Sequence, residues 1–225
     1  MPTSSTHRRD VRWTGLAPDE RREQRRALLV DAGFDLLGTE GAVGTTVRAV
    51  CHNAELNPRY FYESFDDIDA LIVAVYDKVI GDLAVVIAES ESDALVAKTP
   101  EAAARIGIER IVRFVDDDRR RARILYVEAA SNAALSAHRV EVNRQAVVSL
   151  EERAVAAAGA WPAGEHVGRI GAAMLIGGVS EVLLDWLDGR INVTRDQLID
   201  DLAVLTLALG QATESIARKR SRSRG

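Results

Sequence analysis

Apolar residues recur along most of this 225-residue chain at intervals of three and four, the spacing of helices with one buried face. The first such segment starts at Asp19, and charged residues lie opposite its apolar face. That face continues from Ala32 and consists of Leu29, Gly33, Phe34, Leu36 and Leu37. No segment alternates apolar and polar residues with the period of two that a half-buried strand requires. The pattern therefore predicts an all-α protein of about nine helices.

The first helix is followed by two short ones whose boundaries carry their own signals. Gly41 supplies a helix stop. Thr45 or Thr46 can cap a second helix, and Asn57 followed by Pro58 suits the cap and first position of a third. A helix, a short helix, a tight turn and another short helix is the order found in helix-turn-helix domains, which place a recognition helix in the DNA major groove.

The third helix lies in "LNPRYFYESF", residues 56–65, which holds four aromatic rings in a chain that is only 5% aromatic. Propensity alone does not hold a two-turn helix, so Phe61 and Phe65, at i and i+4, are predicted to anchor it inward behind Leu56. Glu63 could accept a hydrogen bond from a cytosine amine, but a solvated acid is the simpler interpretation. The other side chains are expected to point outward or sideways: Arg59, Tyr60, Tyr62 and Ser64.

The alternative is that all four rings belong to the core, because aromatic side chains are usually buried. That alternative accounts for the two phenylalanines. It does not account for the flanking caps or for the basic character of the first thirty residues.

The helices predicted after this segment form a C-terminal bundle. Thr99 and Pro100 open one of them, and Thr194 with Gln197 forms a capping box for the last. The predicted organisation is a mobile basic arm, a helix-turn-helix domain, a helical bundle and a basic tail: residues 1–18, 19–67, 68–217 and 218–225.

Charge is distributed unevenly along a chain of net charge −5. Residues 1–30 carry seven arginines against four acidic residues, and the final "RKRSRSRG" carries five bases and no acid. Residues 66–217 carry fifteen bases and twenty-five acids, so this acidic body is not expected to meet nucleic acid. For the basic tail alone, a role in solubility is an equally good explanation.

Several classes of protein are excluded by what the sequence lacks. A single cysteine, Cys51, excludes an internal disulfide framework and indicates a reducing compartment, with the cytoplasm as the default. No signal peptide is recognisable, and no apolar run is expected to cross a bilayer. The four histidines lack metal-ligand spacing and no glycine-rich phosphate loop is present, so neither an enzyme, a cofactor nor a metal site is predicted.

The N-terminal segments resemble the DNA-binding domain of the TetR family of transcriptional regulators. The resemblance covers roughly residues 22–76 and rests on "GFDLLGTEG", "TTVRAV", "AEL", "NPRYFYESF" and "DDIDALIVAVY" in matching order and spacing. It implies that Thr46 and Arg48 contact the DNA backbone. It also implies that five residues face the groove: Asn57, Arg59, Tyr60, Tyr62 and Ser64.

Two positions depart from the family pattern. Glu55 stands where a turn glycine is usual, and a non-glycine residue in a left-handed turn costs about 1 kcal/mol. Ile68 stands where many members carry a phosphate-binding lysine. We therefore expect that backbone contact to come from arginines of the first helix: Arg21, Arg22, Arg25 and Arg26.

The resemblance further implies a homodimer formed through the last two helices. Gly168, Gly171, Gly177 and Gly178 fit a close helix–helix approach there, either between chains or within one chain. It also implies a small-molecule site in the bundle, whose occupancy shifts the dimer between states. Polar residues among apolar neighbours are the weak candidates for ligand contacts: Tyr76, Arg110, Arg113, Tyr126, Glu128, Asn132, His138, Trp161 and His166.

The function implied is that of a cytoplasmic DNA-binding repressor released from its operator by a small molecule. The alternative is a helical bundle that binds small molecules or proteins without specific DNA binding. Glu55, Ile68 and the acidic body keep that alternative open.

Overall fold

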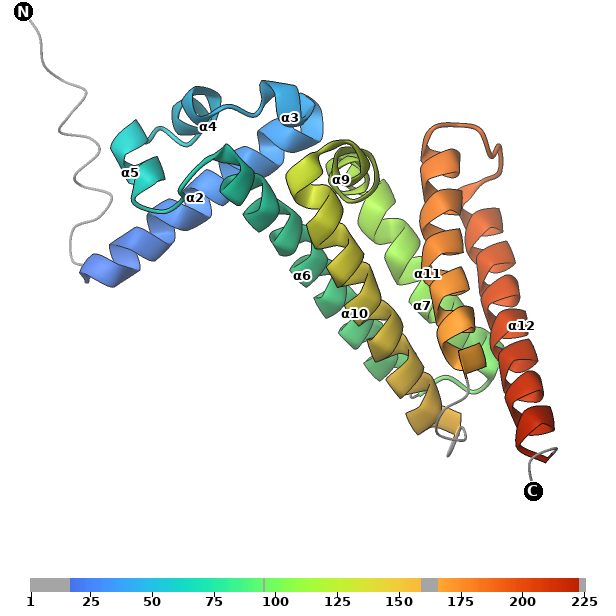
Figure 1. Ribbon diagram of the computed structural model, residues 1–225. Coiled ribbons are helices and arrows are strands. Elements are labelled where there is room, and N and C mark those ends of the chain that lie inside the picture. The colour runs from blue at the N-terminus through green and yellow to red at the C-terminus, as the bar shows by residue number, and fades with distance from the viewer. Residues whose placement is uncertain (1–16, 95, 159–165, 223–225) are drawn as a thin grey trace, which may run out of the picture. The chain divides into compact units, whose positions relative to one another are not determined.

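The computed structural model describes residues 17–94, 96–158 and 166–222, which form helices and turns without a β-strand (Figure 1). The all-α prediction is confirmed. The chain divides into two compact units, Met1–Asp77 and Lys78–Gly225. Most of the predicted arm, residues 1–16, and the end of the tail, residues 223–225, lie outside the described residues.

From residue 17 onward, the first unit contains four helices and the start of a fifth. Their bounds are α2 (Pro18–Thr39), α3 (Gly41–Gly44), α4 (Val47–Asn53), α5 (Pro58–Tyr62) and α6 (Ile68–Ala94). The chain leaves α2 through Gly41, whose φ of 77° is strained for any other residue type, and the predicted stop is confirmed. The core is made by large apolar side chains from four of these helices: Leu29, Leu37, Val50, Phe61, Leu71 and Val75.

Side-chain caps mark the starts of α4 and α6, and the predicted cap of α4 is confirmed. Thr46 Oγ1 accepts from the Ala49 N–H at 3.2 Å, so Thr46 is the N-cap of α4. The Asp67 carboxylate accepts from the Ala70 N–H at 2.8 Å ahead of α6. These local bonds satisfy N–H groups that the first helical turn leaves without partners, and this fixes where each helix begins.

The second unit packs its long helices side by side (Figure 1). Their bounds are α7 (Pro100–Asp116), α10 (Ala133–Ala158), α11 (His166–Leu187) and α12 (Arg195–Arg222). Between α7 and α10 the structure has α8 (Arg119–Ala122), the π-helix η2 (Arg123–Glu128) and α9 (Ala129–Ser131). A π-helical turn holds extra residues per turn, which apolar spacing does not reveal.

Helices α11 and α12 approach closely at one of the four predicted glycines. A Cβ on Gly171 would lie 2.7 Å from Thr213 Oγ1, so only glycine fits without displacing Thr213. A Cβ on Gly177 or Gly178 would meet nothing within 4 Å among the described residues. Close approach within the chain thus accounts for Gly171 but not for Gly177 or Gly178.

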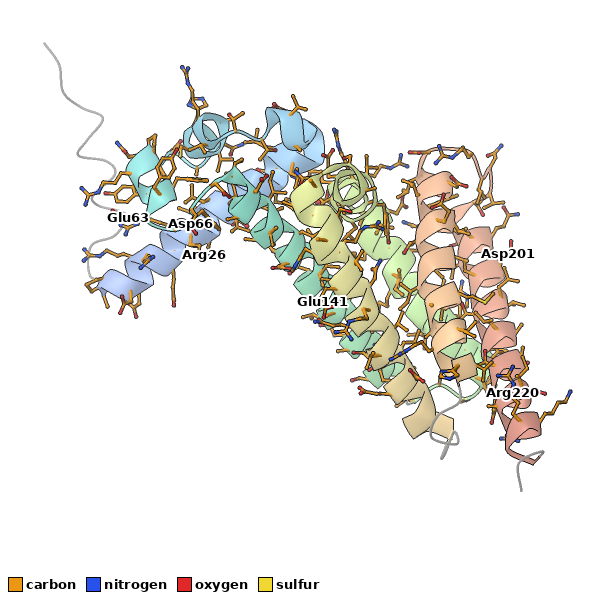
Figure 2. The ribbon with its side chains drawn as sticks, viewed as in Figure 1. Arg26, Glu63, Asp66, Glu141, Asp201 and Arg220 are labelled. Carbon is orange, nitrogen blue, oxygen red and sulfur yellow. The ribbon has the colours of Figure 1, made fainter. Side chains whose placement is uncertain are left out.

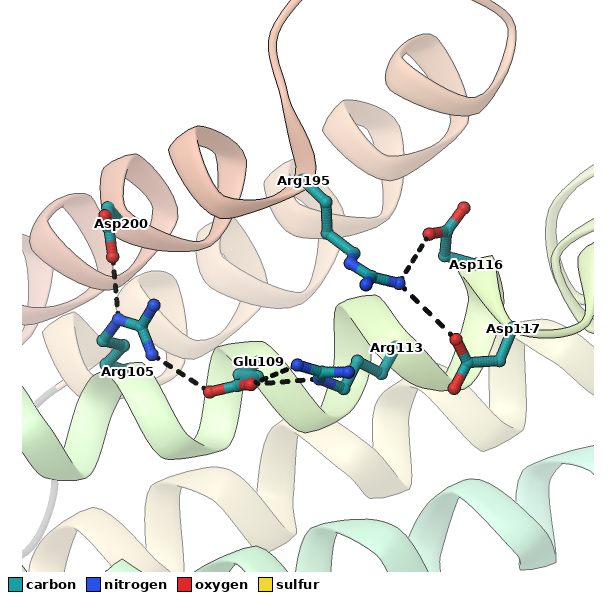
Figure 3. A network of polar contacts seen from close by, with 7 residues as sticks. All are labelled: Arg105, Glu109, Arg113, Asp116, Asp117, Arg195 and Asp200. Atoms are coloured by element: carbon teal, nitrogen blue, oxygen red, sulfur yellow. Dashed lines mark hydrogen bonds and ion pairs between the residues drawn. The ribbon is translucent and has the colours of Figure 1, made fainter.

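A polar network runs along the edge between α7 and α12 (Figure 3). Arg105 donates to Asp200 at 2.8 Å and to Glu109 at 3.0 Å, and Arg195 donates to Asp116 at 3.1 Å. The Arg105–Asp200 pair is exposed and Asp116 is partly buried, and ion pairs with this access to water contribute little to stability. Buried apolar side chains of the two helices, such as Val112 and Ile199, therefore supply most of the packing energy.

Helix α11 departs from the expectation that no segment could cross a bilayer. Its 22 residues include a window of mean hydropathy 1.6, which is long and apolar enough to span a membrane by composition alone. Only 11% of that window is buried within the structure. A helix that gives an apolar face to a protein partner meets the same criterion.

Candidate nucleic-acid interface

The turn between α4 and α5 is tight and strained at one residue. The Leu56 N–H donates to the Cys51 carbonyl at 2.9 Å, which folds the chain back after α4. Glu55 has a φ of 53° and is the only non-glycine residue of positive φ in the described part of the chain. The departure from glycine at this position is therefore accommodated in a left-handed turn, at a cost of about 1 kcal/mol.

Helix α5 begins as the sequence predicts and divides its rings between two environments. Asn57 Oδ1 accepts from the Arg59 N–H at 2.9 Å, and Pro58 occupies the first helical position. Phe61 and Phe65 are buried, with their ring centroids 5.6 Å apart. Tyr62 is 62% exposed, so the predicted division into inward anchors and outward rings is confirmed.

The side chains predicted to meet DNA differ in their accessibility. Those of Tyr60 and Ser64 are partly buried, and the Ser64 hydroxyl donates to the Tyr60 carbonyl at 3.1 Å. The others are exposed on α4, on α5 or at their caps: Thr46, Arg48, Asn57, Arg59 and Tyr62. The structure therefore brings these exposed groups together on two short consecutive helices.

The arginines of α2 pack against α5 and the residues that follow it. The Arg25 guanidinium lies 4.3 Å from the centroid of the Tyr60 ring, and that of Arg26 lies 4.9 Å from the Phe65 ring. Arg22 donates to the Glu63 carbonyl at 2.6 Å, while Arg21 is partly buried. Cation–π contacts of this kind hold an arginine beside a ring without neutralising its charge.

Glu63 is a residue whose role the sequence interpretation missed. Its Oε1 accepts from Arg59 Nε at 3.0 Å, and its Oε2 accepts from Arg25 Nη2 at 3.5 Å. The i,i+4 spacing of Arg59 and Glu63 was a signal for the first contact. The contact with Arg25 joins residues far apart in the sequence and had no local signal.

The exposed side chains of this surface offer the chemistry of polar contact. Burial raises the pKa of the Cys51 thiol, which disfavours the reactive thiolate. No cluster of three or more metal-ligating side chains occurs in the described segments. Arginine, tyrosine and asparagine on short capped helices can instead bind phosphates and base edges.

Comparison with solved structures shows which fold this is. A TetR-like transcriptional regulator from Rhodococcus sp. RHA1 aligns with 87% of this chain and 97% of its own, with a TM-score of 0.55 and 20% identity. The chain has the TetR-regulator fold. At such identity the likeness concerns the fold, and neither a protein-family model nor a curated protein matches the sequence.

Two further solved structures to which this chain is similar contain bound small molecules. The transcriptional regulator FadR from Bacillus subtilis, in complex with stearoyl-CoA, aligns with 84% of this chain and 97% of its own at 15% identity and a TM-score of 0.60. The multidrug binding protein EbrR, complexed with imidazole, aligns with 86% of this chain and 90% of its own at 18% identity and a TM-score of 0.61.

The candidate ligand residues of this TetR fold occupy three environments. Tyr76 and Glu128 are buried, and Tyr126, Asn132 and His138 are partly buried. The exposed candidates are Arg110, Arg113 and His166. Trp161 lies outside the described residues.

Several of these candidates already have partners within the chain. The Glu128 carboxylate accepts from Arg123 Nε at 3.0 Å, and Asn132 Oδ1 accepts from the Leu135 N–H at 3.1 Å. Arg110 donates to Asp93 at 2.6 Å on the surface. The structure thus places Tyr126 and Glu128 together on η2, apart from the surface arginines.

Tyr126 offers a test of how firmly η2 packs on α11. Burial raises the pKa of Tyr126 to about 12, against a smaller lowering by its hydrogen bond to Ser180. The pKa of Tyr126 in the folded state exceeds the ordinary value of 10.0, so the neutral phenol contributes to the stability of the folded state. This contribution is complete below pH 10 and is lost as the pH rises through 12.

We expect the free energy of unfolding to fall by about 1–2 kcal/mol more in the wild type than in Tyr126→Phe over that interval. Urea titrations at a series of pH values measure the difference, with Tyr62→Phe as an exposed control. If the free energy of unfolding falls equally with pH in the wild type and in Tyr126→Phe, the Tyr126 ring is solvated.

Proposed function

We propose that this chain is a homodimeric DNA-binding transcriptional regulator that responds to a small molecule, acts in the cytoplasm and is not an enzyme. The observation that carries the proposal is α5, a short capped helix anchored by Phe61 and Phe65 with Arg59 and Tyr62 exposed. The N-terminal position and tight turn before it are those of a recognition helix. Repression by blocking access to a promoter is the simplest action for such a protein.

Each exposed group has a suitable partner on DNA. The Arg59 guanidinium can donate two hydrogen bonds to a guanine edge, and the Tyr62 hydroxyl can donate to a phosphate. Thr46, Arg48 and the arginines of α2 are proposed to contact the backbone. Asn57, Tyr60 and Ser64 complete the proposed groove-facing set, although Asn57 also caps its own helix.

The proposed dimer forms through α11 and α12. These helices lie side by side and leave large apolar side chains mostly or partly exposed: Ile170, Met174, Val204, Leu205 and Ile216. The open space beside Gly177 and Gly178 would let a second backbone approach closely. A symmetric pair is also what a helix-turn-helix protein needs to read two half-sites about 34 Å apart.

Two carboxylates placed on this face should separate the subunits. We expect Met174→Asp combined with Leu205→Asp to weaken dimerisation by at least about 100-fold, because each charge would be buried twice in a symmetric interface. Sedimentation equilibrium measures the change, with Val140→Asp on exposed α10 as the control. A wild type of 24.5 kDa at micromolar concentration would contradict the proposed dimer.

The small-molecule site is proposed among the interior polar groups of the second unit. Tyr126, Glu128 and His138 are its most enclosed candidates there. The stearoyl-CoA bound to FadR and the imidazole bound to EbrR are consistent with ligand binding in this fold. A ligand that binds one dimer state more tightly would shift the population away from the DNA-competent state.

Selection from genomic DNA tests the proposal and identifies the operator in the same experiment. Purified protein would be mixed with fragments of its own genome, and the retained fragments sequenced after washing at increasing salt. The proposal requires a small set of fragments that share a two-fold-symmetric sequence. Retention without sequence preference would favour a helical bundle that binds other partners.

A further inference from the structure

We infer that Glu63 is a specificity-determining positioning residue that holds Arg59 in one orientation for base reading; this rests on the proposed DNA-binding function. Glu63 is the C-cap residue of α5, one turn after Arg59. It does not itself need to contact a base. Its effect on selectivity acts through the arginine that it holds.

The geometry explains why a single carboxylate can orient the guanidinium. Glu63 Oε1 binds Arg59 Nε at 3.0 Å, which leaves both terminal nitrogens of Arg59 without a partner among the described residues. Those two nitrogens form the fork that matches the O6 and N7 acceptors of guanine. The Arg59 side chain is 81% exposed, so this ion pair is its main restraint.

Glu63 is itself fixed from α2, which makes it a suitable support. Arg25 binds its other carboxylate oxygen at 3.5 Å, and Arg22 binds its backbone carbonyl at 2.6 Å. The Arg25 side chain is only 16% exposed and also lies over the Tyr60 ring. A side chain that is held by a fixed partner loses less conformational entropy on binding, which favours the one contact for which it is oriented.

The carboxylate has a second effect on an otherwise basic surface. Its negative charge offsets the nearby arginines and so weakens their attraction for phosphates of any sequence. Loss of Glu63 therefore combines stronger binding to unrelated DNA with poorer discrimination. Removal of an acid that holds no arginine would give only the first of these effects.

Asp66 provides that matched control. It lies close to Glu63 beyond the end of α5 (Figure 2), it is exposed, and it has no ion-pair partner in the described part of the chain. Both Glu63→Gln and Asp66→Asn remove one negative charge with little change of shape. The two variants differ in whether an arginine loses its ionic partner.

The experiment measures affinity for a selected genomic fragment and for unrelated DNA by fluorescence anisotropy at fixed salt. We expect Asp66→Asn to tighten both complexes alike, and Glu63→Gln to lower the ratio of the two affinities about tenfold. In an Arg59→Ala background, Glu63→Gln should no longer change the ratio, because no arginine is left to orient. Thermal unfolding of each variant confirms that the fold is retained.

The outcomes separate this inference from the proposal on which it rests. If the wild type discriminates but Glu63→Gln behaves like Asp66→Asn, or if its effect persists without Arg59, the positioning role is wrong. If the wild type binds all DNA equally, the proposed function fails and the inference fails with it.

Discussion

Replacement of Arg59 and Tyr62 together by alanine is expected to weaken binding to the selected operator by at least about 100-fold. A bidentate arginine contributes about 1–3 kcal/mol of discrimination at one base pair, and the loss of a phosphate contact weakens binding to every sequence. Both side chains are exposed on α5, so their removal leaves the core intact. A two-fold-symmetric dimer carries two copies of α5, so each substitution removes its DNA contact at both half-sites.

The measurement is an anisotropy titration with operator and with unrelated DNA at several salt concentrations. The salt dependence of the variant should be shallower, because removal of the Arg59 charge lowers the number of counterions released on binding. Arg144→Ala serves as the control, since Arg144 is an exposed arginine of α10 in the other unit. A double variant that keeps wild-type selectivity would show that α5 does not read the sequence.

The second large effect concerns the inward side of the same helix. Phe61 is fully buried, and its replacement by alanine is expected to destabilise the first unit by about 3–5 kcal/mol through lost burial and the cavity left behind. Tyr62→Ala, one residue further along, should cost less than about 1 kcal/mol because that ring is mostly exposed.

Cys51 provides a local probe for this difference. Its thiol is 3% exposed on α4, within the core that Phe61 completes. Reaction with a thiol reagent therefore requires the first unit to open, and the rate follows the open population when closing is fast. We expect Phe61→Ala to accelerate labelling by about two orders of magnitude or more, and comparable rates in both variants would contradict the assignment of Phe61 as the anchor.

Local signals made much of the first unit predictable from the sequence. Asn57 and Pro58 fixed the start of α5 because capping depends on neighbours within three residues. The i,i+4 spacing of Phe61 and Phe65 identified the buried face for the same reason. Such predictions hold because the interactions behind them lie within one or two helical turns.

Features that depend on distant residues were not predictable in this way. Glu63 looked like a solvated acid because Arg22 and Arg25, 41 and 38 residues away, reach it only after α2 and α5 have packed. The π-helical turn at Tyr126 leaves the apolar pattern unchanged. The sequence did not indicate that the side chain of Asn132, a candidate ligand residue, would cap α10.

Recognition of a particular DNA sequence is the property on which the proposed function depends, and a single ratio measures it. The affinity of the wild type for a fragment selected from its genome would be divided by its affinity for unrelated DNA of equal length, at one near-physiological salt concentration. We predict a ratio of at least about 1,000. A ratio near one would show that the protein does not read sequence.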